Sequence, residues 1–212
     1  MAIRGAVRSV MVAMLRLLSL LILPLLLSAC GEEIPPVPKP RSYPRIEYPA
    51  RDYAPLAADY CSFTFERPAS SRVVQETNFF DEAPADPCWF DLKLDPALNG
   101  TIHFSYYPVR DAAQWEELRD EAFELVGVHN QRASHIDEIV IHRDDADVHG
   151  IAFDIAGPAA SPYQFFLTDS TRHFLRGALY FEAKVDPDSL APVVQYVKED
   201  IGRIVESLRW TD

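Results

Sequence analysis

Several kinds of residue and motif are scarce in this chain, and their scarcity excludes classes of function. Basic residues number 20 against 32 acidic ones, which gives a formal net charge of −12 at pH 7. A surface of this sign repels nucleic acid and anionic lipid head groups. The sequence has no Gly-x-Ser-x-Gly, His-Glu-x-x-His or Cys-x-x-Cys motif and no glycine-rich phosphate loop. We therefore predict no nucleic-acid partner, no cofactor, no metal site and no catalytic residue.

The first thirty residues carry the pattern of an export signal. Three arginines precede an apolar run over residues 17–27, and the small residues Ser28 and Ala29 stand directly before Cys30. The run is too short and too one-sidedly basic for a spanning helix, so it predicts a lipoprotein signal peptide over residues 1–29. Cleavage would leave Cys30 with a diacylglycerol on its sulfur and a further acyl chain, such as palmitate, on its amino group. Two or more acyl chains hold a protein at a membrane. An uncleaved single-span anchor is the alternative.

The two remaining cysteines form an even pair. In an exported protein Cys61 and Cys88 meet an oxidising compartment, which favours a disulfide between them. Such a bridge would close a loop of roughly 28 residues and contribute about 3.5 kcal/mol in the chain-entropy description. Each cysteine begins a run of alternating character, so we expect the bridge to join neighbouring β elements. A metal-binding pair or two free thiols remain open at this point.

Composition divides the mature chain into a linker and one domain. Seven prolines fall between residues 35 and 55, which disfavours helix and regular sheet and predicts a semi-rigid linker over residues 30–58. Tyrosines in its second half indicate that this part lies against the domain. The rest, residues 59–212, has the length of one ordinary domain.

The patterns within the domain predict an α+β fold. Apolar and polar residues alternate in seven segments, near 61–67, 88–94, 100–107, 137–143, 148–156, 162–168 and 173–184. Helical spacing predicts one helix from an Asp111 cap to about Gly127 and another capped by Ser189, with Pro192 in its first turn. We expect a mainly antiparallel sheet of about seven strands packed with two helices as a sandwich.

One acidic turn offers a candidate cation site. Asp144, Asp145 and Asp147 lie between His142 and His149, and carboxylate and imidazole groups bind divalent cations. Aspartate and Gly150 are also the residues that a turn between two strands needs, and the spacing is not that of an EF-hand loop. A ligand- or metal-binding lipoprotein that uses residues 144–149 is therefore the alternative function. A hydrolase is a third possibility, and it would require an acid such as Asp154 or Asp169 beside a histidine in a pocket.

An aromatic segment over residues 163–181 carries the candidate partner-binding residues. Arg172, His173 and Arg176 bring three basic groups together in an otherwise acidic protein. They either pair with nearby acids or face an acidic partner. His103 stands alone between apolar residues of a predicted strand, so we expect it to point away from them and to be solvated or locally bonded.

The same segment, continued through Ser189–Val194 and Val197–Ile201, resembles the gliding motility lipoprotein GldD family of Bacteroidota. Residues 39–46, the segment 86–89 with its upstream Cys61, and the small residues before Cys30 add to this resemblance. The chain is more acidic and richer in alanine and proline than typical members.

The resemblance implies a non-catalytic assembly or stabilising component of the gliding motility and type IX secretion machinery. Its partners would be other envelope proteins of that machinery, and lipid on Cys30 would hold it at the outer membrane. The acidic Glu32 and Glu33 leave both the periplasmic and the cell-surface side open. The family supplies no catalytic residue to transfer.

Overall fold

The structure is a computed structural model that describes Met14, Arg16 and residues 45–78 and 82–211. The chain divides into two compact units, Met1–Ser42 and Tyr43–Asp212. Apart from Met14 and Arg16, the predicted signal peptide lies outside the described residues, as do Cys30 and the first half of the predicted linker. None of the described helices combines the length and the apolar character that crossing a membrane requires.

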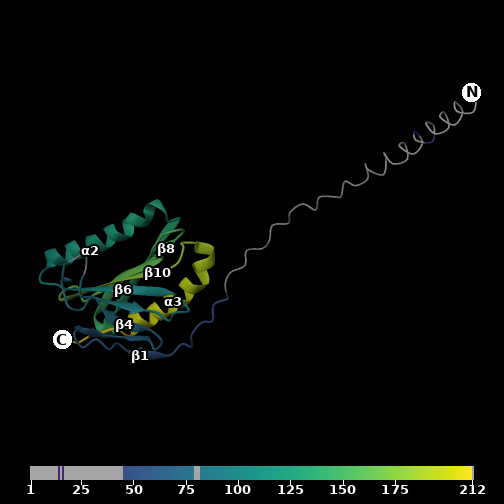
Figure 1. The fold of residues 1–212 in the computed structure, drawn as a ribbon. Helices are drawn as coiled ribbons and strands as arrows, with labels where there is room; N and C mark the ends of the chain where they lie inside the picture. Colours follow the sequence, from purple (N-terminus) through teal and green to yellow (C-terminus); the bar gives the residue numbers. More distant parts are fainter. Residues whose placement is uncertain (1–13, 15, 17–44, 79–81, 212) are drawn as a thin grey trace, which may run out of the picture. The chain divides into compact units, whose positions relative to one another are not determined.

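A seven-stranded antiparallel sheet forms the centre of the second unit (Figure 1). Every neighbouring pair of its strands is antiparallel. The order across the sheet is β4 (Arg72–Gln75), β5 (Phe90–Lys93), β6 (Gly100–Pro108), β10 (His173–Phe181), β9 (Tyr163–Thr168), β8 (Val148–Ala156) and β7 (His135–Arg143). The predicted α+β class is confirmed.

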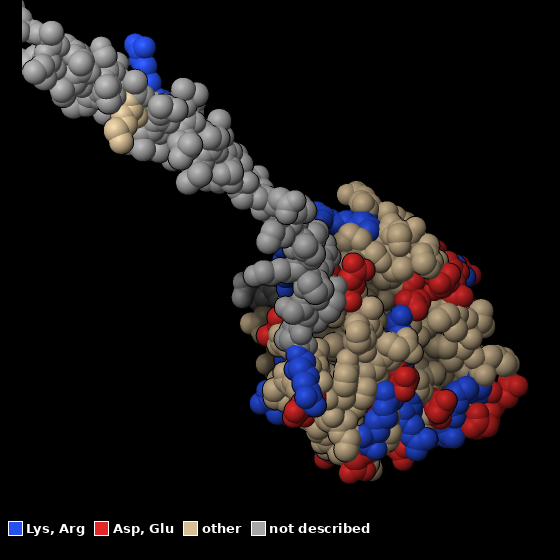
Figure 2. Space-filling model, turned by 90° about the vertical axis from the view of Figure 1, so that its right-hand side faces the viewer, with Lys and Arg blue, Asp and Glu red and all other residues tan. Residues whose placement is uncertain are grey.

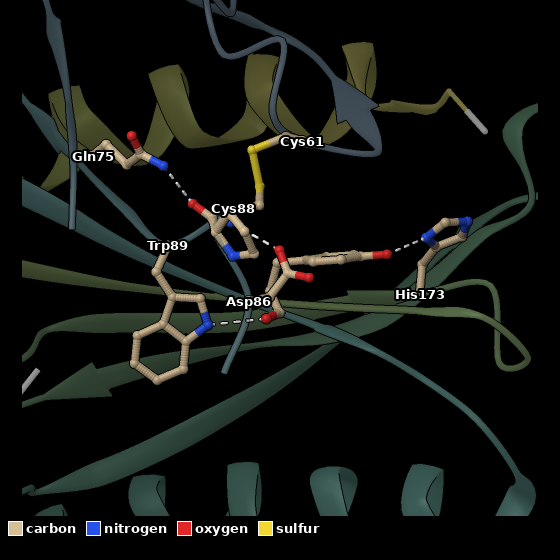
Figure 3. Close-up of a disulfide and its surroundings, with 8 residues drawn as sticks. Cys61, Gln75, Asp86, Cys88, Trp89 and His173 are labelled. Atoms are coloured by element: carbon tan, nitrogen blue, oxygen red, sulfur yellow. Dashed lines mark hydrogen bonds between the residues drawn. A yellow bond between two sulfur atoms is a disulfide. The ribbon is translucent and has the colours of Figure 1, made fainter. Parts of the chain in front are cut away.

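The two helices cover opposite faces of this sheet, as Figures 1 and 3 show. Helix α3 (Pro187–Ser207) buries one apolar stripe against one face, and helix α2 (Ala112–Gly127) buries a second cluster against the other. Each fully buried large apolar side chain contributes about 1.5–3 kcal/mol. The stripe of α3 comprises Val193, Val197, Ile201 and Ile204, and the buried residues of α2 are Leu118, Ala122 and Val126.

The predicted strand over residues 61–67 is divided and lies outside the central sheet. β2 (Phe63–Thr64) pairs with β11 (Arg209–Trp210), whereas β3 (Glu66–Pro68) pairs with β1 (Tyr53–Pro55). The seventh strand of the sheet is instead β4, which the alternation did not reveal because three of its four residues are exposed. Two short 3₁₀ helices, η1 (Val128–Gln131) and η2 (Asp144–Ala146), complete the elements.

The start of α3 differs from the prediction. Asp186, not Ser189, is the N-cap, and its carboxylate accepts a hydrogen bond from the Ser189 backbone N–H at 3.4 Å. Pro187 then occupies the start of the helix, where its missing N–H costs nothing. Pro192 consequently lies inside the helix. The cap of α2 is as predicted, because Asp111 Oδ1 accepts from the Gln114 N–H at 2.8 Å.

Residues 45–58, here called the N-terminal strap, pack on the domain. The Tyr48 ring lies 4.8 Å from the Tyr196 ring of α3, and the Tyr53 hydroxyl donates to Asp200 Oδ1 at 2.9 Å. The second half of the segment assigned to the linker therefore lies against the domain, as its tyrosines predicted.

The Cys61–Cys88 disulfide is present and joins β elements of different sheets (Figure 3). Cys61 precedes β2, and Cys88 lies two residues before β5 of the central sheet. The Cys88 backbone N–H donates to Asp86 Oδ1 at 2.8 Å, and the Gln75 side-chain amide donates to the Pro87 carbonyl at 2.9 Å. These hydrogen bonds hold residues 86–88, which contain one end of the disulfide, against the edge of the sheet.

Candidate functional site

The three predicted basic residues do not form one cluster. His173 and Arg176 are three positions apart on β10, and residues of a strand share a face only at even separations. His173 therefore points to the α3 face and Arg176 to the α2 face. Arg172 precedes the strand, and 62% of its side chain is exposed.

His173 belongs to the core under α3. Only 3% of it is exposed, the Tyr106 hydroxyl lies 2.7 Å from its Nδ1, and the Trp210 ring stacks on it at 4.7 Å. Burial lowers the pKa of His173, and Arg172 lowers it further against the opposing effect of Asp169. The imidazole is thus neutral at neutral pH and out of reach of a partner protein.

Asp169 stabilises the turn between β9 and β10. Its Oδ1 accepts hydrogen bonds from the backbone N–H groups of Thr171, Arg172 and His173, at 2.9, 2.7 and 2.9 Å. Burial alone raises the pKa of Asp169, but these donors outweigh it and hold the pKa below its usual value. The carboxylate does lie beside His173, yet neither residue lines either of the two described pockets. The hydrolase alternative required an acid beside a histidine in a pocket, and this pair does not meet that condition in the two pockets described.

The acids of the turn pair with different basic residues, and the two histidines among these contact each other through their Nδ1 atoms at 2.9 Å. His142 Nε2 lies 2.9 Å from Asp144 Oδ1, and His149 Nε2 lies 3.1 Å from Asp147 Oδ1. Asp145 instead pairs with Arg143 and Arg209. Within the described ranges, no group of three or more His, Cys, Asp or Glu residues is arranged to hold a metal ion. This geometry favours the turn interpretation of residues 144–149.

An open groove lies on the α2 face of the sheet. Its volume is about 500 Å³, and α2 forms one wall through Glu121 and Leu125. The core contacts of α2 fall on β8, β9 and the start of β10, so the helix leaves β5, β6 and the rest of β10 uncovered. The other lining residues include Trp89, Tyr107, Tyr180, Ser105 and Arg176.

Trp89 is held in place at this groove by the sheet itself. Its indole N–H donates to the Tyr106 carbonyl at 2.9 Å, and its ring meets the Tyr107 ring edge-on at 5.4 Å. Figure 3 shows the indole on the α2 side of the sheet, away from the disulfide. The groove therefore has a fixed aromatic wall.

Arg176 is the half-buried cation of the groove. Its Nη2 donates a long hydrogen bond of 3.4 Å to Gln164 Oε1, and no carboxylate of the described residues lies within ion-pairing distance. Burial lowers the pKa of Arg176, against the opposing effects of Tyr180, Tyr107 and Glu121. Arginine stays protonated at neutral pH, so the groove contains a charged, partly desolvated guanidinium.

Asp91 does not supply the missing counter-charge. It pairs with His103 and, at 3.0 Å, with Lys93 Nζ. Burial raises the pKa of Asp91, but these two partners outweigh it and lower the pKa. His103 is exposed and locally bonded, as predicted.

The remaining lining residues give the groove no hydrolase-like pair. Ser105 lines the same groove without a hydrogen bond to His103, so nucleophile and base are not joined. Glu76 and Glu121 complete the polar lining.

The sequence indicated only part of the groove. Arg176 was named as a candidate, and its distance from His173 along the strand already separated the two faces. Trp89 and Tyr107 were not identified as site residues, because the groove depends on where α2 crosses the sheet.

Comparison with known proteins gives a matching family and several similar solved structures, one of which is described here. The family model described as gliding motility lipoprotein GldD matches residues 33–210. No curated protein matches the chain. The solution structure of cyanobacterial PsbP (CyanoP) from Synechocystis sp. PCC 6803 aligns with a TM-score of 0.47 and 8% identity, over 76% of this chain and 94% of that chain.

Proposed function

Because the chain belongs to the gliding motility lipoprotein GldD family, we propose that it is a non-catalytic assembly or stabilising component of the gliding motility and type IX secretion machinery. The signal pattern that ends at Cys30 supports a lipid anchor in the outer membrane, on either its periplasmic or its outer side. In this role the domain acts by contact with other envelope proteins.

The observation that carries a contact role is Arg176 in its open groove. A partly desolvated guanidinium that has no ion-pair partner among residues 45–78 and 82–211 is unfavourable in the isolated domain. A carboxylate from a partner protein would satisfy it by a two-point hydrogen-bonded ion pair, which is among the stronger polar contacts. The aromatic wall of Trp89 and Tyr107 suits the apolar part of the same segment. We therefore assign the groove to an acidic residue on a partner protein.

The charge distribution on the rest of the surface favours recognition of a partner through a local contact, not through long-range electrostatic attraction. Figure 2 shows acidic and basic side chains interspersed on the face that it presents, rather than one extended patch of a single sign. Ion pairs between exposed groups contribute little. A groove with a preformed cation is then the better candidate for recognition.

The test is a clean deletion in the native host, complemented with full-length variants. Colony spreading and secretion of a type IX cargo protein are scored, with immunoblots of the lipoprotein as a level control. We expect loss of either phenotype on deletion and rescue by the wild-type gene. Arg176→Gln should rescue poorly. Arg172→Gln, which removes an exposed arginine that does not line the groove, should rescue fully.

The outcomes separate the two parts of this proposal. If spreading and secretion both survive the deletion, the chain has no role in this machinery in its host. If the deletion abolishes them but Arg176→Gln rescues as well as the wild type, the machinery role holds and the groove is not the contact.

A further inference from the structure

The strand β7 leaves one edge of the central sheet unpaired. It bonds to β8 over nine consecutive residue pairs, from His135 opposite Ala156 to Arg143 opposite Val148. No strand of residues 45–78 or 82–211 pairs with its outer side. Alternate backbone N–H and C=O groups of an edge strand point outward and can accept another strand. The opposite edge strand, β4, has only four residues.

Several of the usual protections against strand pairing are missing from this edge. β7 contains no proline and no lysine, and its uninterrupted register excludes a bulge. Val140 is 77% exposed and Ile139 is 46% exposed. Because neighbouring residues of a strand point to opposite faces, the strand presents one apolar side chain on each face at its centre.

We propose that β7 pairs antiparallel with β7 of a second copy of this chain. With the twofold axis at Val140, Ile139 of each copy lies opposite Ile141 of the other. Glu138 lies opposite His142 in the same register, on the face that also carries Val140. Directly opposite residues of an antiparallel pair share a face, so each of these contacts is geometrically allowed.

The sequence of β7 favours the register with the axis at Val140 over the register with the axis at Ile139. With the axis at Val140, Asp137 also lies opposite Arg143, although that guanidinium already donates to two carbonyls at the end of α3. Moving the axis to Ile139 would place Glu138 opposite Val140 and leave both acids facing apolar side chains. Moving the axis by one residue thus removes both pairings of an acid with a basic side chain.

A second copy fits better than a strand of arbitrary sequence. The chain as a whole is strongly acidic, but the two acids of β7 are placed so that under twofold symmetry Glu138 meets His142 and Asp137 meets Arg143. An isologous interface of this kind closes as a dimer and does not propagate.

Site-specific cross-linking of the full-length chain in native membranes tests the register. In Val140→Cys the two introduced thiols lie opposite each other on the axis, within the Cα separation that a disulfide allows. In the matched control Glu138→Cys, the two thiols are about 13 Å apart along the strands. Of the native cysteines, Cys61 and Cys88 are bonded to each other, and the lipid proposed for Cys30 blocks its thiol; the wild-type chain, which should give no dimer, is the control for Cys30.

We expect several-fold more disulfide dimer from Val140→Cys than from Glu138→Cys after mild oxidation, on non-reducing gels. The double variant Glu138→Cys with His142→Cys should restore dimer formation. Equal yields from the two single variants would indicate random collision and overturn the proposal. So would the absence of dimer from Val140→Cys, or its cross-linking to a protein of another size.

Discussion

Removing the disulfide gives a stability change that follows from the chain positions of its cysteines. Cys61 and Cys88 are 27 positions apart, so breaking the bridge releases a loop of about 28 residues in the unfolded chain. The chain-entropy relation gives about 12 cal/mol/K for this loop, or about 3.6 kcal/mol at 25 °C. Unfolding about 165 residues has an entropy near 0.35 kcal/mol/K at the midpoint. We therefore expect the melting temperature to fall by about 10 °C.

The assay is thermal unfolding followed by circular dichroism on the Cys61→Ala/Cys88→Ala variant. Alanine is chosen because Cys88 is fully buried, and a serine would add an unsatisfied hydroxyl. Wild-type protein in reducing agent is the matched control and should melt near the variant, whereas the variant itself should not respond to the reductant. A fall of less than about 3 °C would refute the reasoning, because it would mean that the loop is already restrained in the unfolded chain.

Three further predictions concern the core. The lowered pKa of His173 means that the unfolded chain binds its proton more readily, so the unfolding free energy should decrease by up to about 1.4 kcal/mol per pH unit as the pH falls below about 6.5. Urea titrations at pH 7 and 5 should show a smaller loss in His173→Gln; an equal loss would contradict this. Arg143→Met removes two donors to carbonyls at the end of α3 and should cost about 1–3 kcal/mol in urea unfolding, whereas no change would mean that water replaces them. Gly150→Ala places a Cβ 1.9 Å from the Phe166 carbonyl oxygen, so we expect loss of more than about 3 kcal/mol; a wild-type melting temperature would disprove that clash.

Local patterns predicted the long strands well. The predicted strands 100–107 and 148–156 correspond to Gly100–Pro108 and Val148–Ala156 in the structure. In both, apolar residues alternate along the strand and give it an apolar face. The N-cap of α2 was also predictable from local sequence, because Asp111 makes its capping hydrogen bond within its own helix. The cap of α3 was misplaced because two capping residues, Asp186 and Ser189, stand three positions apart, and Pro187 decides between them.

Features that depend on pairing between distant segments could not be predicted from local sequence patterns. The run over residues 61–67 alternates like one strand, but its two halves pair with β1 and β11, two segments more than 150 residues apart in the sequence. The groove around Arg176 likewise requires knowing which strands α2 covers. Alternation places Arg176 on a face, but only the crossing of the helix leaves that face open.

The position of the disulfide also determines how the domain would respond to mechanical load. Tension applied at the N-terminal end of the strap would first separate Tyr48 from Tyr196, then detach Arg51 from Glu199, which it contacts at 2.7 Å, and then separate β1 from β3. Peeling would stop at Cys61, because its bond to Cys88 passes the force directly to the central sheet. The slack released between residues 45 and 61 is about 55 Å for an extended chain. The bridge is thus a mechanical stop, and after reduction the same pull would continue into β2 and separate it from β11.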